Sequence, residues 1–216
     1  MASVGPSDDS TALEHIVESM ELRRQSLGLD RWVIWGMSGG SFLAQLYART
    51  HSARVQGLVL ASSGPNFRRT VEDPECILSP RNSHWSSKLE SEGLLDGRYD
   101  EGPTGWQFVA DVGWVFRRVG GAALLVSPDT PSVELKRIMP ALWSFDACDW
   151  LSHIEHPALV MCGTADPIVP IRHAEALAAQ MPHARFVAVQ DAGHVPLTDQ
   201  RLMVEGAIRS FLAELA

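Results

Sequence analysis

The segment GMSGG at residues 36–40 sets a serine among glycines in a G-x-S-x-G pattern. It follows a short apolar run at 32–36 and precedes a helix-prone run at 41–48. A sharp turn between a buried strand and a helix presents a serine hydroxyl for nucleophilic attack. The pattern therefore predicts that Ser38 is a nucleophile, and a plain glycine-rich turn is the alternative.

A serine hydroxyl needs a neighbouring base, and the base needs a third group to orient it. Two candidates follow later apolar runs: Asp166 lies in CGTADPIVP and His194 in DAGHVP. Loops that follow parallel strands open on one edge of the sheet, so we expect Ser38, Asp166 and His194 to converge there. Taken singly, an Asp before Pro is a common turn former, and a loop histidine is usually exposed.

Other polar residues offer alternatives to this triad. Glu72 and Asp73 follow the second apolar run and could serve as the acid instead of Asp166. His153 and His156 have a spacing that could hold a metal, but no third ligand stands nearby in the sequence, and a zinc site needs three or four. We expect neither a metal nor an organic cofactor.

Short apolar runs alternate with helix-prone segments along most of the chain. Unbroken apolar runs are typical of strands that are buried on both faces of a parallel sheet, and their alternation with helices indicates the α/β class. Asp199 is a candidate N-cap for the last helix. The expected strands are 32–36, 55–61, 158–163 and 185–190, and the expected helices are near 11–28, 41–48, 171–181 and the end of the chain.

Residues 64–150 interrupt this alternation and are rich in Gly, Pro, Ser and Trp. An insertion of this length between two strands predicts a helical cap, which leaves 1–63 and 151–216 as the core. An apolar substrate pocket under the cap is one role for its tryptophans, and packing is the other. The candidate pocket residues are Met37, Trp106, Trp114 and Trp143.

The composition excludes several classes of protein. Among 216 residues, 18 Lys and Arg stand against 26 Asp and Glu, for a net charge of -8, whereas nucleic-acid binders carry basic patches. No apolar run approaches the roughly 20 residues of a membrane span. Three cysteines without CxxC spacing do not make a disulfide framework. Since no secretory signal is visible, we expect a cytoplasmic protein that acts on a small molecule.

Taken together, these motifs resemble the α/β-hydrolase fold family, in the cap-bearing branch that includes esterases, lactonases, carbon–carbon hydrolases and proline iminopeptidases. The resemblance covers residues 31–61 and 157–214. It implies that Asp166 and His194 are acid and base, and that the Gly39 amide is an oxyanion donor. The expected reaction is hydrolysis of an ester, lactone or amide, and a lyase or other reaction on the same fold stays open.

The stretch 32–60 is particularly similar to proline iminopeptidases, which makes an aminopeptidase the second candidate. That subfamily normally has Gly at the position of Met37 and Trp at that of Gly39, so the elbow departs from it.

In the family, several strands precede the elbow strand, and the loop after one of them carries the second oxyanion amide. Residues 1–31 contain one expected helix and no His-Gly pair. The resemblance therefore implies a fold that lacks its N-terminal strands, with the elbow strand as an exposed edge. We expect weak activity and self-association through that edge. A non-catalytic remnant that binds a full-length relative is the alternative.

Overall fold

The computed structural model describes residues 9–77, 79, 81–82, 138 and 140–216. Most of the expected cap, including Trp106 and Trp114, lies outside these residues.

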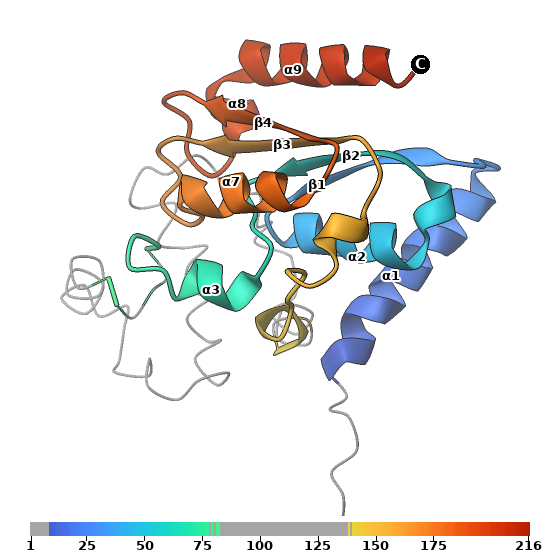
Figure 1. Ribbon diagram of the computed structural model, residues 1–216, viewed down its shortest axis with the longest axis horizontal. Helices are drawn as coiled ribbons and strands as arrows, with labels where there is room; N and C mark the ends of the chain where they lie inside the picture. Colours follow the sequence, from blue (N-terminus) through green and yellow to red (C-terminus); the bar gives the residue numbers. More distant parts are fainter. Residues whose placement is uncertain (1–8, 78, 80, 83–137, 139) are drawn as a thin grey trace, which may run out of the picture.

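Four parallel strands form one sheet in the order β1-β2-β3-β4, so β1 is an edge strand (Figure 1). The α/β class with a parallel sheet is confirmed. The last strand lies one residue earlier than predicted at both ends: it begins at Ala184 and ends at Val189, and Gln190 already belongs to the exposed turn. The strands are β1 (Trp32–Met37), β2 (Val55–Ala61), β3 (Ala158–Gly163) and β4 (Ala184–Val189).

Helices cover both faces of the sheet (Figure 1). One face packs against α1 (Asp9–Ser26), α2 (Gly39–Thr50) and α7 (Ile171–Gln180), and the other against α9 (Arg201–Glu214). Shorter helical segments lie in the connections. They are η1 (Ser52–Arg54), α3 (Phe67–Val71), η3 (Leu151–His153) and α8 (Pro196–Asp199).

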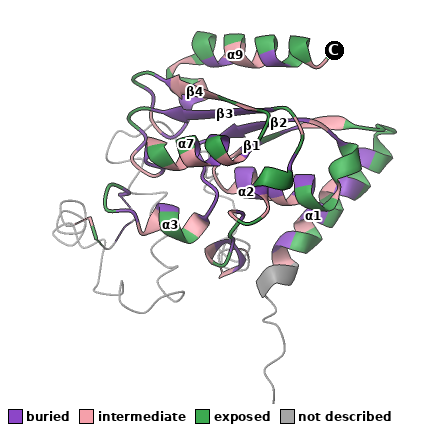
Figure 2. Cartoon of the chain, viewed as in Figure 1, coloured by how far each residue is buried: buried purple, intermediate pink, exposed green. Residues whose placement is uncertain are grey.

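The sheet separates two apolar clusters, and among the described residues its central strands β2 and β3 are almost entirely buried (Figure 2). Leu13 and Val17 of α1 pack into the larger cluster, and their spacing of four residues places them on one face of the helix. The smaller cluster joins Val204 and Phe211 of α9 to β2 and β3. Burial on both faces explains why the strand sequences are unbroken apolar runs.

The two ends of the inserted segment run side by side beneath α2. The amide of Phe67 donates to the carbonyl of Phe145 at 3.3 Å, and Asn66 and Asp146 form an antiparallel bridge. The Phe42 ring of α2 packs edge-on against Phe67 and Phe145, with centroids 5.4 and 5.0 Å away. Residues 66–67 and 145–146 therefore lie side by side in the described structure.

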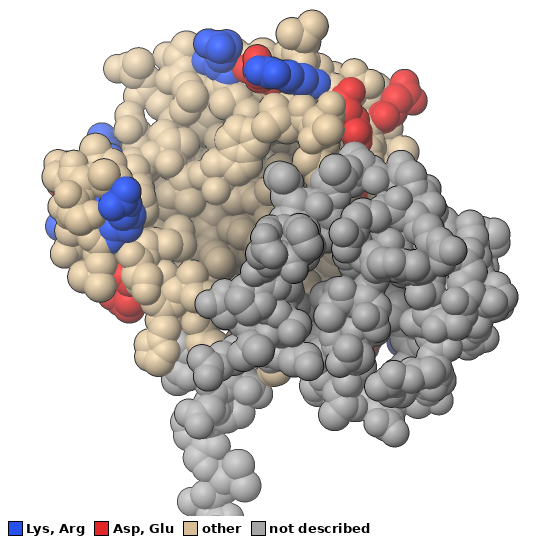
Figure 3. Space-filling view, turned by 180° about the vertical axis from the view of Figure 1, so that it is seen from behind, with Lys and Arg blue, Asp and Glu red and all other residues tan. Residues whose placement is uncertain are grey.

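None of the described helices is both long and apolar enough to cross a membrane. In the view from behind, a broad hollowed part of the described surface below the top of the molecule carries no charged side chains (Figure 3).

Candidate active site

Ser38 lies in the sharp turn between β1 and α2. It is the N-cap residue of α2, and its φ of 52° falls in the left-handed region. A non-glycine residue there is strained and needs its surroundings to hold it. The Ser38 amide donates to the Ala61 carbonyl of β2, and its carbonyl accepts from the Ser41 amide, both at 2.9 Å. The predicted strand, strained turn and helix are therefore present.

Gly36 is the glycine that the turn requires. A Cβ on this residue would lie 2.4 Å from the carbonyl oxygen of Gly40, which is backbone and cannot easily move. Only glycine lets β1 pass so close to the first turn of α2. Gly40 itself has nothing within 4 Å of a built Cβ, so its lack of a side chain is not demanded by packing.

The Ser38 hydroxyl is not used to cap α2. The first amides of a helix have no partner within the helix and favour a negative charge at that end. Gly39 is the first residue of α2 and directly follows Ser38. Its amide is thus the donor nearest in sequence to an oxyanion that would form on a carbonyl attacked by Ser38.

Asp166 and His194 form a buried pair on the loops that follow β3 and β4. The ring Nδ1 of His194 lies 2.9 Å from Oδ2 and 3.1 Å from Oδ1 of Asp166. The histidine side chain is 7% exposed and the aspartate side chain 0%. A carboxylate at Nδ1 orients the ring and leaves Nε2 for a second partner. No described residue hydrogen-bonds to Nε2, the nitrogen that takes the serine proton in a catalytic triad.

The turn around Asp166 holds its carboxylate in place. The amides of Ile168 and Val169 donate to Oδ1 at 2.8 and 3.0 Å. The thiol of Cys162, near the end of β3, lies 3.7 Å from Oδ2. Asp166 therefore forms the turn that its Asp-Pro sequence suggests and also positions the imidazole.

The loops after β3 and β4 are in direct contact. A Cβ on Gly163 would lie 2.1 Å from the carbonyl oxygen of Ala192, so the close approach requires glycine. The same carbonyl accepts from the Ala165 amide at 2.9 Å. The Gly193 amide donates to Oδ2 of Asp199 at 2.8 Å. The prediction that Asp199 caps the last helix is wrong, because α9 begins at Arg201 and Asp199 instead braces the His194 loop.

Ser38 and the Asp166–His194 pair lie at the carboxyl ends of strands in the same parallel sheet. The expected convergence of the three residues at one edge follows from this topology. Among the described residues, no hydrogen bond joins the Ser38 hydroxyl to the His194 ring. Catalytic hydrogen bonds are often long without substrate and tighten when it binds.

Asp73 and Glu72 have other partners and do not reach His194. Asp73 accepts from Arg172 of α7 and lies 2.7 Å from Nε2 of His173. Burial raises the pKa of Asp73, but the Glu75 amide and Arg172 outweigh it and hold the pKa below its ordinary value. Glu72 pairs with Arg68 at 2.8 Å. The alternative in which either carboxylate serves as the triad acid is therefore wrong for this arrangement.

Ser62 is a residue at this edge that sequence reasoning missed. It follows the last residue of β2, is fully buried and has a φ of 50°. Its hydroxyl has no hydrogen-bond partner among the described residues. Since Met37 pairs with Ala61, Ser38 and Ser62 are strained residues at neighbouring strand ends. Nothing in the short sequence ASSGP distinguishes this serine from the next one.

The described candidate pocket residues are Met37 and Trp143. Both are partly buried, and the Trp143 ring packs edge-on against Phe67 with centroids 6.3 Å apart. The Leu142 side chain lies 3.9 Å from a Cβ built on Gly39, so the returning end of the insertion reaches the elbow.

No group of three or more possible metal-ligating side chains occurs among the residues that the structure describes. His156 Nε2 lies 2.9 Å from the Ser52 hydroxyl, which gives this ring a partner other than His153.

A family model described as the alpha/beta hydrolase family matches residues 2–205. The chain belongs to this family. It is accordingly a hydrolase, which confirms the class of enzyme expected from the motifs.

Individual relatives and a solved structure agree with this assignment. Over 194 residues the chain is 28% identical to the pimeloyl-acyl-carrier protein methyl ester esterase of Aromatoleum aromaticum, covering 83% of this chain and 75% of the esterase. The proline iminopeptidase of Neisseria gonorrhoeae is 43% identical over 54 residues, which are 25% of this chain and 17% of that enzyme. An alpha/beta fold family hydrolase from Bacillus anthracis superimposes with a TM-score of 0.73 at 14% identity, covering 97% of this chain and 78% of that chain.

Proposed function

We propose that the protein hydrolyses carboxylic esters, with Ser38 as nucleophile, His194 as general base and Asp166 as the group that orients the base. The observation that carries this proposal is the buried contact of 2.9 Å between His194 Nδ1 and Asp166 Oδ2. The strained backbone of Ser38, which directly follows β1 of the same sheet, supports the proposal.

The reaction proceeds in two steps. Ser38 Oγ attacks the ester carbonyl while His194 Nε2 takes the hydroxyl proton, and the Gly39 amide stabilises the oxyanion. The imidazolium returns that proton to the leaving alkoxide, which departs as an alcohol and leaves an acyl group on Ser38. Water then gives a proton to His194 and attacks the acyl carbonyl, and His194 returns that proton to Ser38 Oγ as the bond to the acyl group breaks, which releases the carboxylic acid and the free serine.

We prefer an ester over other carbonyl substrates because the similarity to an esterase extends over most of the chain. The relative that is a methyl ester esterase aligns with 83% of this chain, whereas the match to the proline iminopeptidase of Neisseria gonorrhoeae covers 25% of it. The partly buried Met37 and Trp143 suit an apolar acyl or alcohol group beside the elbow.

A proline aminopeptidase is the second candidate. The 43% identity to the Neisseria gonorrhoeae proline iminopeptidase favours it, although that match spans only 54 residues. Met37 and Gly39 differ from the Gly and Trp that the subfamily normally has at these positions, and Gly39 adjoins the nucleophile.

The test combines active-site labelling with a choice of substrates. The protein is treated with a fluorophosphonate, and the labelled peptide is identified by mass spectrometry. Hydrolysis of p-nitrophenyl butyrate and methyl butyrate is compared with that of proline p-nitroanilide. Ser38→Ala is the test variant. Ser210→Ala is the matched control, because Ser210 is exposed on α9.

We expect labelling at Ser38, its loss in Ser38→Ala, and faster hydrolysis of the esters than of the anilide. Faster turnover of the anilide would favour the aminopeptidase. A folded wild-type protein that takes up no label and hydrolyses neither class would overturn the proposal and favour the non-catalytic alternative. Labelling that persists in Ser38→Ala would exclude Ser38 as nucleophile.

A further inference from the structure

Cys162 is a buried thiol in contact with the acid of the proposed triad. It is the penultimate residue of β3 and is fully buried. Its Sγ lies 3.7 Å from Asp166 Oδ2 and 3.5 Å from the carbonyl oxygen of Val169. Both distances are within the range of a weak hydrogen bond from sulfur.

The carboxylate of Asp166 divides its partners between its two oxygens. Oδ1 accepts from the amides of Ile168 and Val169. Oδ2 is the oxygen closest to the His194 ring, at 2.9 Å, and it is also the oxygen that Cys162 approaches. Among the described side chains, only His194 and Cys162 hydrogen-bond to this carboxylate.

One S–H proton cannot serve both acceptors at once. A carboxylate is charged and accepts a stronger hydrogen bond than a neutral carbonyl. The proton of Cys162 therefore favours Asp166 Oδ2 over the carbonyl of Val169, even though the carbonyl is slightly closer.

Cys162 is a thiol and not a thiolate under ordinary conditions. Burial raises its pKa well above the usual range, and the charges of Asp166 and of Glu175 on α7 raise it further. The ionisable groups that act on the sulfur thus both favour its protonated, donating form. A protonated buried thiol is not a nucleophile.

We propose that Cys162 is a positioning residue whose S–H donates to Asp166 Oδ2, limits rotation of the carboxylate and moderates the negative charge felt by His194. The inference rests on the proposed function, in which Asp166 orients His194. It extends that function by a residue on β3 that acts on His194 through Asp166.

Removing the donor leaves more negative charge on the carboxylate that faces the imidazole. A stronger negative charge stabilises the imidazolium and raises the pKa of His194. In Cys162→Ala and Cys162→Val we expect the titration of His194 to move to higher pH, by less than the removal of a full charge would cause, because a thiol is a weak donor. Cys162→Ser keeps a donor, so its titration should not move to higher pH.

The pKa of His194 is measured by NMR titration of the full chain with isotope-labelled histidine, and the resonance is assigned from its loss in His194→Gln. The pH dependence of kcat/KM for p-nitrophenyl butyrate provides a second reading of the same group. Val160→Ala is the matched control. Val160 is buried in β3 and belongs to the same apolar cluster as Cys162, but it has no polar atom on its side chain.

The proposal predicts that Cys162→Ala and Cys162→Val move the titration of His194 to higher pH and that Cys162→Ser does not. Val160→Ala should lower the melting temperature and leave the titration of His194 unchanged. An unchanged pKa in Cys162→Ala and Cys162→Val would overturn it, as would an equal shift in Val160→Ala. The NMR titration needs no turnover. An inactive wild-type protein would therefore refute the proposed function, and the NMR titration would still show whether Cys162 acts on His194.

Discussion

Asp166 presents both carboxylate oxygens to one nitrogen of His194, at 2.9 and 3.1 Å from Nδ1. Because a carboxylate only accepts hydrogen bonds, the neutral ring carries its proton on Nδ1 and has an accepting Nε2. The pair is buried and comes from loops after two adjacent strands. This relationship selects the tautomer that a serine nucleophile needs.

Replacing the acid should remove most of the activity and leave the fold. In Asp166→Asn the side-chain amide can donate to Nδ1 and so favours the wrong tautomer, for which a loss of about 10⁴-fold in kcat is typical. The measurement is steady-state hydrolysis of p-nitrophenyl butyrate, with circular dichroism to verify folding.

Asp191→Asn is the matched control for this change. Asp191 is exposed on the same loop as His194 and has a φ of 55°, a conformation that Asn tolerates. We expect activity near that of the wild type. A similar loss in both variants would show that activity depends on the loop and not on the carboxylate of the proposed triad.

The two glycines around the elbow should respond oppositely to alanine. Gly36→Ala would force Cβ to within 2.4 Å of the Gly40 carbonyl oxygen, which moves the backbone beside Ser38. We expect a lower melting temperature and little fluorophosphonate labelling. Gly40→Ala meets no atom within 4 Å, and alanine favours a helix over glycine by about 1 kcal/mol.

The measurements are thermal unfolding and labelling rate. An unchanged melting temperature in Gly36→Ala, or a strongly lowered one in Gly40→Ala, would contradict the packing described for this turn.

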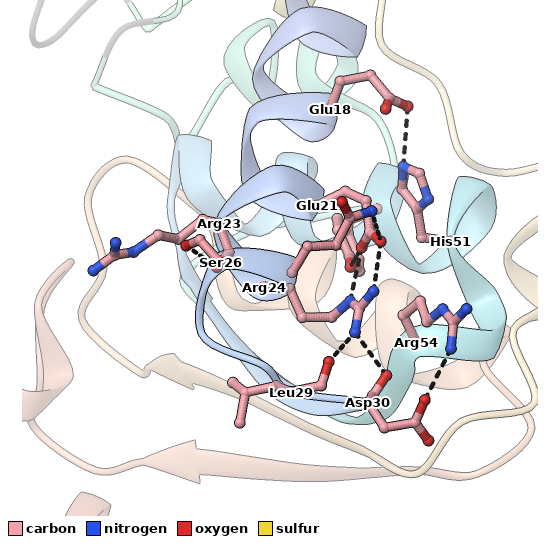
Figure 4. Close-up of polar contacts among 11 residues, drawn as sticks. Glu18, Glu21, Arg23, Arg24, Ser26, Leu29, Asp30, His51 and Arg54 are labelled. Carbon is pink, nitrogen blue, oxygen red and sulfur yellow. Dashed lines mark hydrogen bonds and ion pairs between the residues drawn. The ribbon is translucent and has the colours of Figure 1, made fainter.

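The cluster around Glu21 should make the fold sensitive to acid (Figure 4). Glu21 accepts hydrogen bonds from Arg24, Gln25 and Tyr47 across α1 and α2. The hydrogen bond from Arg24, followed by that from Tyr47, lowers the pKa of Glu21 far below its ordinary value of 4.5. A group with a lowered folded pKa contributes stability above its unfolded pKa and loses it as the pH falls through the folded pKa.

We therefore expect the melting temperature to fall as the pH drops below about 4.5, and to fall less steeply in Glu21→Gln. Glu18→Gln is the control, because Glu18 is exposed and pairs with His51 at the surface and not with a buried group. Equal acid slopes in wild type and Glu21→Gln would exclude Glu21 as a source of this stability.

The stability that depends on Tyr47 is lost at high pH, whereas that of Glu21 is lost at low pH. Burial, followed by the hydrogen bond to Glu21, raises the pKa of Tyr47 to about 12. Its contribution is complete below the unfolded pKa of about 10 and is lost as the pH rises through the folded pKa. Tyr47→Phe should be less stable at neutral pH and should lose less stability between these two values. Thermal melts across the alkaline range check this, and parallel curves would contradict it.

The free edge of β1 should allow two copies of the chain to associate. In the described sheet β1 pairs only with β2, its sequence WVIWGM carries no charge, and Trp35 is 45% exposed. An uncharged edge with unpaired backbone groups invites another strand. Sedimentation velocity over a range of concentrations should show self-association, and Trp35→Lys should reduce it.

Leu202→Lys is the control, since Leu202 is 86% exposed but lies on α9, away from the edge. A chain that is monomeric at all concentrations would refute the prediction, and an equal effect of both variants would assign the contact to hydrophobicity in general.

The pattern of strands and helices could be predicted from the sequence because it depends on residues that are close together in the chain. The run ALVMCG matches β3 residue for residue, since a strand buried on both faces leaves an unbroken apolar signature. The end of β4 and the cap of α9 were misjudged. Gln190 lies in the turn after β4, and Asp199 accepts a hydrogen bond from the Gly193 amide. Local propensity predicts neither of these two positions.

The sequence by itself determined the alternation of strands and helices, the glycine-framed turn at Ser38 and the order of the candidate triad, because each is a short-range pattern. Only the tertiary structure decided which carboxylate meets His194, that Asp73 is engaged by Arg172, and that Cys162 touches Asp166. Such contacts depend on the register of strands and on how closely their loops approach. The partners Asp73 and Arg172 are 99 residues apart along the chain, a separation over which no local pattern specifies a contact.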